Sequence, residues 1–313
     1  MSSDAHVPVL LEPVLKGLNL RRDGRYVDGT FGRGGHSRAI LEQLNADGQL
    51  IAIDRDPQAI ASAAPALAND PRLTLIRSEF ANLATCIDRR GLTGQVDGLL
   101  LDLGVSSPQL DQAERGFSFL RDGPLDMRMD PDSGVAASEW LETVEEAELK
   151  RVIKQFGDER YAARIARAVV AARAQTPILR THELAAIVEQ AVPAGRPKRG
   201  PKKHPATKTF QAIRIFINKE LEQLEAALSQ CIDVLAVGGR LCVISFHSLE
   251  DRMVKRFIRD ASREAEQYRG MPNVPVEFQP KLKPIGKVIS ATADEIAENV
   301  RSRSARLRIA ERI

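Results

Sequence analysis

Residues 26–37 read YVDGTFGRGGHS, a short apolar run followed by an acid and a turn that contains several glycines. Glycine lets the backbone adopt positive φ and approach a ligand closely, so Gly32, Gly34 and Gly35 are typical of a binding turn. The residues that follow predict a helix whose free N-terminal amides face the same turn. The stretch therefore predicts a strand, a ligand-binding turn and a helix, in that order.

The N-terminal third of the chain repeats this alternation of strand and helix. Continuous apolar runs such as LIAI and LLLDL suit strands that are buried on both faces of a parallel sheet. We therefore predict an α/β fold with a Rossmann-like, doubly wound sheet. The strands are expected at residues 25–30, 49–56, 72–80 and 96–104, with a helix at residues 57–67 between the second and third strands.

The pattern changes in the middle of the chain. Residues 109–206 predict helices and loops without a convincing strand, so we expect an inserted helical domain. A long helix is expected from Thr207 to Leu235, ended by Gly238 and Gly239, and buried strand RLCVISF follows at residues 240–246. ARLRIAER, residues 305–312, predicts a half-exposed edge strand. The expected domains are a discontinuous one, residues 1–108 and 207–313, and the insertion.

Composition narrows the class of protein. No run reaches the roughly 20 apolar residues that a membrane helix needs, and nothing near the start resembles a signal peptide. The three cysteines are too few and too scattered for a zinc cluster or a disulfide framework. We expect a cytoplasmic protein without a metal centre or a membrane partner. Between Glu189 and Glu220 the chain holds only basic charges, typical of a solvated loop or of a phosphate-binding segment.

Acidic residues near the ends of the predicted strands indicate the ligand. Asp54 lies about 20 residues beyond the glycine turn, where an acid commonly binds two ribose hydroxyls. Ser37 occupies the third glycine position of a dinucleotide fingerprint, and Asp28 precedes the turn. This combination fits S-adenosylmethionine, whose amino-acid end carries an ammonium group. Phe80 is a candidate for the adenine face or for the core, and Asp102 ends the fourth strand at the expected binding crevice.

Eight blocks of the sequence together resemble the ribosomal RNA small-subunit methyltransferase H family, and the resemblance covers nearly the whole chain. It is weaker in GRPKRGPKK and in residues 259–290. The blocks are HVPVLLEPV, YVDGTFGRGGHS, AIDRDPQAI, LLLDLGVSSPQLDQAERGFSF, GPLDMRMD, HPATKTFQAIRIFINKELE, GGRLCVISFHSLEDRMVKRF and VRSRSARLRIAER.

The resemblance implies that the enzyme methylates the exocyclic N4 of one cytosine in the decoding region of 16S rRNA, within the small ribosomal subunit. It also implies a helical domain that recognises the substrate. The oligomeric state stays open, with a homodimer as one alternative. By matching motif, the cofactor contacts implied are Gly34, Gly35, His36, Asp54, Phe80, Asp102 and Gln109.

The chemistry of a cytosine amine indicates the catalytic candidates. Its lone pair is delocalised into the ring, so an acceptor for the amino protons favours the reactive, pyramidal nitrogen. Asp102 and a backbone carbonyl near Leu103 or Gly104 are the expected acceptors, with Ser106 or Ser107 assisting. His247 either contacts the base or receives a proton, or is a structural histidine. The candidates for stacking on the base are Phe117, Phe119, Phe246 and His247, each of which equally suits core packing.

Three other functions compete with this interpretation. An NAD-linked oxidoreductase conflicts with Ser37 at the third glycine position. A methyltransferase for proteins or small metabolites conflicts with the acid-free basic stretch. A ribosome-assembly factor that keeps a cofactor pocket without catalysis is the main alternative, and fold alone does not separate it from an enzyme.

Overall fold

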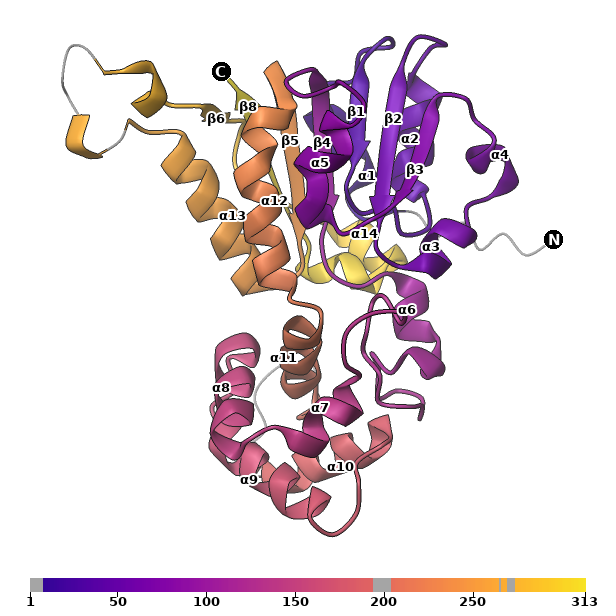
Figure 1. The fold of residues 1–313 in the computed structure, drawn as a ribbon, viewed down its shortest axis with the longest axis vertical. Helices are drawn as coiled ribbons and strands as arrows, with labels where there is room; N and C mark the ends of the chain where they lie inside the picture. The colour runs from indigo at the N-terminus through magenta and orange to yellow at the C-terminus, as the bar shows by residue number, and fades with distance from the viewer. Residues whose placement is uncertain (1–7, 194–203, 265, 269–273) are drawn as a thin grey trace. The chain divides into compact units, whose positions relative to one another are not determined.

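The chain forms two compact units in a computed structural model, which describes residues 8–193, 204–264, 266–268 and 274–313 (Figure 1). Unit 1 consists of Met1–Gly104 and Leu221–Ile313, and unit 2 of Val105–Glu220. Within the described ranges, no helix combines the length and the apolar character that crossing a membrane requires. Each unit has a hydrophobic core of its own.

Unit 1 is built on a single twisted sheet. Its strands follow the order β3-β2-β1-β4-β5-β8-β6, and β7 also pairs with β8. The first five strands are parallel, whereas β8 runs antiparallel to β5, β6 and β7. The α/β fold with a Rossmann-like sheet is therefore confirmed. The strands are β1 (Arg25–Asp28), β2 (Gln49–Asp54), β3 (Leu73–Arg77), β4 (Val96–Asp102), β5 (Leu235–Ser245), β6 (Leu282–Pro284), β7 (Ile289–Ser290) and β8 (Arg306–Arg312).

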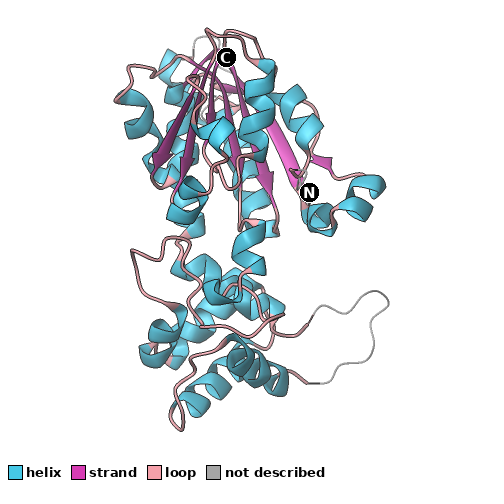
Figure 2. Ribbon diagram, turned by 90° about the vertical axis from the view of Figure 1, so that its right-hand side faces the viewer, coloured by secondary structure: helices cyan, strands magenta, loops and turns pink. Residues whose placement is uncertain are grey.

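Helices cover both faces of this sheet (Figure 2). Successive side chains of a strand point to opposite faces. Thus Leu99 and Leu101 of β4 join the core under α5, α12 and α13, while Leu100 joins the core under α1 and α2. The helices of this unit are α1 (Leu11–Leu18), α2 (Gly35–Gln43), α3 (Pro57–Ala61), α4 (Pro65–Ala68), η1 (Phe80–Asn82), α5 (Leu83–Asp88), α12 (Glu220–Val234), α13 (Ser248–Ala261), η3 (Glu266–Tyr268), η4 (Val276–Phe278), α14 (Ala293–Glu298) and η5 (Val300–Ser304).

Unit 2 is a small helical bundle. Its core includes Leu149, Ile165, Leu184 and Ile213, which come from four different helices. The described part of this unit holds one isolated bridge, between Pro124 and Arg180, and no other strand pairing. The helices are α6 (Ser107–Asp111), η2 (Ala113–Arg115), α7 (Ala137–Thr143), α8 (Glu146–Gly157), α9 (Ala162–Arg173), α10 (Thr181–Ala191) and α11 (Thr207–Ile217).

The expected long helix from Thr207 to Leu235 is wrong, because it breaks between α11 and α12. Lys219 has a φ of 50°, which is not helical. The buried Asn218 side chain bonds to the backbone of a distant segment. Its amide nitrogen donates to the carbonyl of Met127 at 2.7 Å and its oxygen accepts from the backbone N–H of Met129 at 2.7 Å. The apolar spacing continues through this break, so periodicity alone could not reveal it.

The expected boundaries were after residues 108 and 206. The structure divides the chain after Gly104 and after Glu220, so α11 belongs to the helical unit. The reason is close packing of α8 on α11: a Cβ at Gly157 would lie 2.7 Å from the carbonyl oxygen of Lys208. Only a glycine allows this approach.

Two smaller expectations also differ from the structure. Residues 57–67 form two short helices rather than one, because Pro65 begins α4 and cannot continue the hydrogen bonding of α3. Strand β8 does not lie at an edge, since Leu282 and Pro284 of β6 pair with its far side. Strand β6 is three residues long and contains lysine and proline, so the sequence carries almost no strand signal there.

Candidate active site

Three neighbouring parallel strands of unit 1 end at aspartates. Asp28 ends β1, Asp54 ends β2 and Asp102 ends β4. Because β1 lies between β2 and β4 in the sheet, the three carboxylates come to the same edge. In open α/β sheets this carboxyl edge is where ligands bind. The structure thus brings together three residues that are far apart in the sequence.

The glycine turn after β1 crosses this edge. Its backbone continues the sheet: Gly29 N–H donates to Leu100 at 2.9 Å, and Phe31 N–H donates to Ile53 at 2.9 Å. Gly32 and Gly34 have φ angles of 56° and 72°, which side chains rarely adopt. A Cβ at Gly32 would meet only a carbonyl oxygen at 3.9 Å, so this part of the turn is an open cradle.

Asp28 lies inside the turn rather than on its surface. It is 1% exposed, and its Oδ2 accepts a hydrogen bond from the Ser37 hydroxyl at 2.7 Å. Its Oδ1 accepts from the backbone N–H of Thr30 at 3.1 Å. Burial raises the pKa of Asp28, while the Ser37 hydroxyl and His36 act in the opposite direction. Asp28 therefore holds the turn, and its expected contact with the cofactor stays a prediction.

Asp54 fixes the turn from the neighbouring strand. Its Oδ2 accepts from the N–H of Gly32 at 2.7 Å, and its Oδ1 accepts from the N–H of Asp56 at 2.8 Å. Burial raises the pKa of this carboxyl to about 6, although both backbone donors favour its ionised form. A carboxylate retains further lone pairs beyond these two bonds. Asp54 therefore keeps acceptor capacity beside the open Gly32.

Asp102 pairs with a buried histidine. His36 Nε2 lies 3.6 Å from Asp102 Oδ2, which is an ion pair rather than a hydrogen bond. Burial disfavours the imidazolium, yet the carboxylates of Asp102 and Asp28 outweigh it and raise the pKa of His36. Among the described residues, Asp102 Oδ1 is buried and has no hydrogen-bond partner. An unpaired buried acceptor is costly, so this oxygen is suited to a donor on a ligand.

Thr30 is a site residue that sequence reasoning missed. Its hydroxyl oxygen accepts a hydrogen bond from the backbone N–H of Asp102 at 2.7 Å and so ties the glycine turn to the end of β4. The only signal in the sequence was its place inside the turn. A threonine there also suits solvent exposure, and the partner on β4 follows only from the fold.

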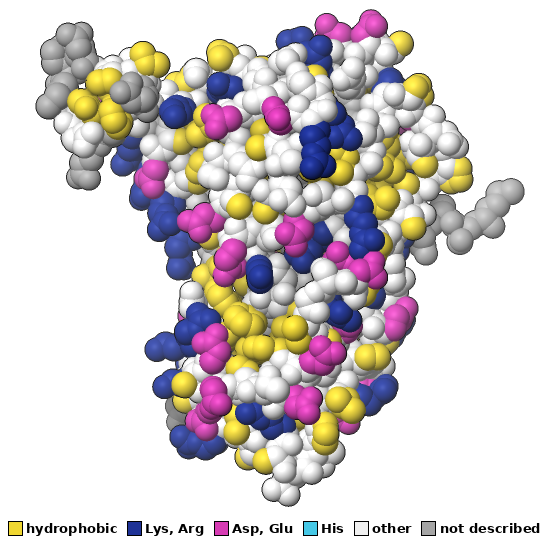
Figure 3. Space-filling view, viewed as in Figure 1, with side chains coloured by type: hydrophobic (Ala, Val, Ile, Leu, Met, Phe, Trp, Pro, Cys, Tyr) yellow, Lys and Arg dark blue, Asp and Glu magenta, His cyan; other side chains and the backbone are white. Residues whose placement is uncertain are grey.

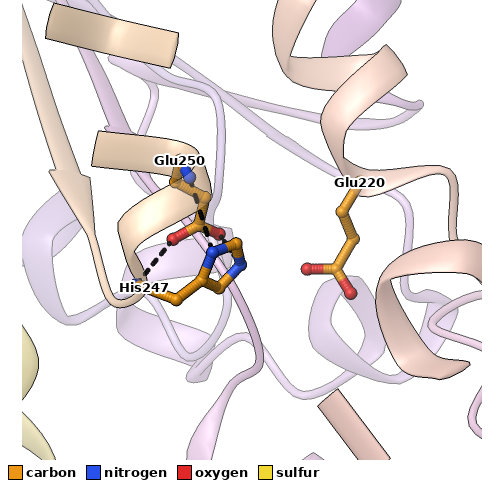
Figure 4. Close-up of side chains that lie close together, drawn as sticks. All are labelled: Glu220, His247 and Glu250. Carbon is orange, nitrogen blue, oxygen red and sulfur yellow. Dashed lines mark hydrogen bonds and ion pairs between the residues drawn. The ribbon is translucent and has the colours of Figure 1, made fainter. Parts of the chain in front are cut away.

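His247 is fixed at the start of α13 by Glu250, as Figure 4 shows. The Glu250 N–H donates to His247 Nδ1 at 3.4 Å, and Glu250 Oε2 accepts from the His247 N–H at 3.3 Å. Nε2 lies 3.1 Å from Glu250 Oε1, with an angle outside that of a hydrogen bond. Both ring nitrogens thus face Glu250, Nδ1 its backbone N–H and Nε2 its carboxylate. The spacing of His247 and Glu250, three residues apart at the start of a helix, is that of a capping box and is visible in the sequence.

The remaining candidates divide between the two units. Phe80 is half-buried beside the core under α5, and Phe246 beside the core under α1 and α2. In unit 2, Phe117 is part of the core, and the Phe119 ring lies 4.9 Å from that of Phe210. The structure thus places these aromatics in or beside cores.

Ser106, Ser107 and Gln109 belong to unit 2, at the start of α6. The Gln109 side-chain oxygen accepts from the N–H of Ser106 at 3.0 Å, which forms a capping box. Gln109 is buried there. Its expected contact with the cofactor stays a prediction. The basic residues Lys198, Arg199, Lys202 and Lys203 lie outside the described residues.

The parallel sheet, the glycine turn and the carboxylates at the strand ends define an α/β protein with a nucleotide-type ligand site. The chain belongs to the MraW methylase family, whose sequence profile matches residues 3–313. The open Gly32 cradle and the acceptor capacity of Asp54 fit the cofactor of such methylases, S-adenosylmethionine.

Solved structures with a similar chain course include two bacterial methylases. The chain is similar to a candidate rRNA methylase from Clostridium thermocellum, with 13% identity, a TM-score of 0.46, and coverage of 98% of this chain and 99% of that one. It is also similar to an rRNA methylase from Streptococcus thermophilus, with 11% identity, a TM-score of 0.41, and coverage of 97% and 93%. The family match, and neither of these weak likenesses, identifies the chain.

Proposed function

We propose that this protein transfers a methyl group from S-adenosylmethionine to the exocyclic N4 of one cytosine in the decoding region of 16S rRNA. The observation that carries the proposal is the buried, unpaired Oδ1 of Asp102 at the end of β4. The amino group of cytosine offers two N–H donors and needs an acceptor to become a nucleophile. The choice of RNA and of base follows from the resemblance of the sequence blocks.

The carboxyl edge of the sheet supplies the residues that would hold the cofactor. Asp54, which accepts from the Gly32 N–H, would also accept the ribose hydroxyls, the Gly32 backbone allows close approach, and Phe80 lies after the next strand. When bound, S-adenosylmethionine supplies an electrophilic methyl group on its sulfonium. The protein's own contribution is to hold the target amine in line with the place of that methyl group, which lowers the entropy cost of reaction.

Asp102 is the proposed acceptor for the cytosine amine. Thr30 fixes its backbone and His36 holds its Oδ2, so Oδ1 is left to face a donor. A carbonyl near Leu103 or Gly104 is the second acceptor, and Ser106 or Ser107 assists. The N4–C bond forms as the sulfonium–C bond breaks, and one N4 proton leaves to solvent. His247 is then a positioning residue, because both of its nitrogens face Glu250.

The helical unit is the proposed recognition domain for the folded rRNA of the small subunit. A target base must leave its stack to be methylated, and the surrounding RNA has to be held by its shape and phosphates. An enzyme with this substrate acts in the cytoplasm, where the subunits assemble.

The test compares 16S rRNA from cells with and without this protein by methylation mapping at single-nucleotide resolution. Asp102→Ala is then assayed with purified small subunits, while calorimetry measures its affinity for S-adenosylmethionine. At a cofactor concentration that the calorimetry shows to be saturating for the variant, we expect a loss of methyl transfer of at least about 100-fold, and Asp102→Asn should recover part of the rate because it keeps one oxygen. Full transfer by Asp102→Ala contradicts the acceptor role. An unmethylated N4 with retained subunit binding identifies an assembly factor instead.

A further inference from the structure

A groove on unit 1 lies between α13 and the segment that joins β6 to β7. Its volume is about 390 Å³, and its lining contains five basic side chains and no carboxylate among the described residues. Figure 3 shows Lys and Arg side chains gathered along the flank that α13 forms. The basic residues that line the groove are Lys255, Arg259, Arg263, Lys287 and Arg308.

Three of these cations have no acidic partner in the part of the chain that the structure describes. Lys255, Arg263 and Lys287 are exposed and form no ion pair there. The other two are neutralised: Arg259 contacts Asp260 at 2.7 Å, and Arg308 contacts Asp251 at 2.8 Å. The groove therefore keeps an excess of positive charge that the protein itself does not balance.

The charge excess belongs to this groove and not to α13 as a whole. The cavity on the other side of α13, towards α12, mixes its charges, because Glu225 and Asp260 line it together with basic residues. These are Arg256, Lys281 and Arg263, the last of which lines both cavities. Only the face towards β6 and β7 is free of acids among its lining residues.

The length of the basic row indicates a polymer. Lys255 and Arg259 lie one helical turn apart on the same side of α13, and Arg263 follows two residues after the helix ends at Ala261. At 1.5 Å per residue the two helical positions are about 6 Å apart, and Arg263 continues the row, so the row is longer than a single phosphate group. The successive phosphates of an RNA strand match such a row.

The register of the sheet brings the groove towards the carboxylate edge. Arg308 pairs with Val243 of β5, and Ser290 of β7 pairs with Arg306, which pairs in turn with Ser245. Ser245 ends β5 beside Asp102, since Asp102 pairs with Ile244. Arg308, which lines the groove, thus lies opposite a position two residues before the end of β5, in the same sheet as Asp102.

We infer that this groove binds the sugar–phosphate backbone of the RNA substrate at a distance from the reacting base. The inference rests on the proposed function for the identity of the RNA, and its own content is the place of contact. Arginine binds phosphate with a planar fork of donors and lysine with a point charge, so both serve backbone contacts. Such contacts position the RNA, and they make its binding constant fall as the salt concentration rises.

The test neutralises the three unpaired cations in one variant, Lys255→Gln, Arg263→Gln and Lys287→Gln. A matched control removes three exposed cations elsewhere on unit 1, Lys16→Gln, Arg22→Gln and Arg89→Gln. Fluorescence anisotropy follows a labelled RNA of the decoding region from 0.05 to 1 M KCl. Calorimetry with S-adenosylmethionine confirms that both variants are folded and keep the cofactor site.

Three lost phosphate contacts should lower the slope of log K against log salt by about 2, at roughly 0.7 for each contact with a single strand. The groove variant should therefore bind about 100-fold more weakly at 0.1 M KCl and converge with the wild type near 1 M. The control variant should lose less than about threefold. Equal losses in both variants, or an unchanged slope in the groove variant, overturn the inference.

Two further readings separate the groove from the proposed function. If the wild type binds the RNA through this groove but leaves N4 unmethylated, the groove stands and the proposed function fails. If N4 is methylated and the groove variant binds as the wild type does, the groove fails alone. Displacement of the RNA by millimolar inorganic phosphate at constant ionic strength would make the groove a site for small anions and so contradict the inference.

Discussion

Asp54 makes the stability of unit 1 depend on pH in a direction that is unusual for a carboxylate. Burial raises its pKa from the ordinary 3.8 to about 6, against the two backbone donors that favour the ionised form. A rise of this size corresponds to about 3 kcal/mol. Because the folded state prefers the neutral carboxyl, this stability is fully present below pH 3.8 and is lost as the pH rises through 6.

The perturbation that isolates this effect is Asp54→Asn. At pH 4.5 Asp54 in the unfolded chain is already mostly ionised, so about 1 kcal/mol is lost there, and about 2 kcal/mol more is lost by pH 7.5. The variant does not titrate at this position. It has one oxygen for two backbone donors, which costs it about 1–3 kcal/mol at either pH. Between pH 4.5 and pH 7.5, the difference in unfolding free energy between variant and wild type should therefore shift by about 2 kcal/mol in favour of the variant.

Urea unfolding of both proteins at pH 4.5 and 7.5 measures this shift, and other titrating groups cancel in the difference. Asp47→Asn, at an exposed aspartate of the same unit, is the control for removing one carboxylate. If the difference between Asp54→Asn and wild type is the same at both pH values, the argument from burial is refuted. A shift in the opposite direction refutes it equally.

Three other substitutions test single contacts by thermal or urea unfolding. Gly34→Ala should cost about 2–4 kcal/mol, because φ is 72° and a Cβ would lie 2.6 Å from a leucine methyl; a loss under about 0.5 kcal/mol contradicts this. Ser37→Ala should cost about 1.5–3 kcal/mol by removing the hydroxyl donor of buried Asp28; an unchanged midpoint excludes that role. Asn218→Ala should destabilise unit 2 by about 2–4 kcal/mol, followed by the fluorescence of the single tryptophan; full retention of the midpoint argues against its bridging role.

The sheet and the carboxylates could be predicted because their signals are local. Apolar runs marked the parallel strands, and an acid directly after such a run marks the carboxyl edge wherever the strand lies in the sheet. Asp28, Asp54 and Asp102 could therefore be named without knowing the strand order. Ser37 was used only as a departure from a dinucleotide fingerprint, and its hydroxyl bond to Asp28 gives that departure a physical reason.

The parts that could not be predicted depend on contacts between distant segments. Asn218 ends α11 because it bonds to the chain near Met127, and no periodicity in residues 207–235 reveals that partner. Gly157 allows α8 and α11 to pack closely, which keeps α11 in the helical unit. The sequence does not reveal this contact, because it depends on how the two helices are placed. Strand β6 forms because its backbone pairs with β8, whereas its own residues have little tendency to form a strand.

Three groups of unit 1 whose pKa values are raised, Asp28, His36 and Asp54, meet at the carboxyl edge of the sheet, and this has an energetic meaning. Burial raises the pKa of Asp28 and Asp54, and the nearby carboxylates raise the pKa of His36 although burial opposes its charge. Strands in a sheet lie about 4.8 Å apart, so acids at the ends of neighbouring strands repel one another. The repulsion between these carboxylates lowers the stability of the fold, and the imidazole of His36 lies beside them as a group that can carry the opposite charge. A ligand that brings an ammonium group and hydroxyl donors to the edge relieves the same repulsion, so binding of the proposed cofactor should stabilise unit 1 more at pH 7.5 than at pH 5.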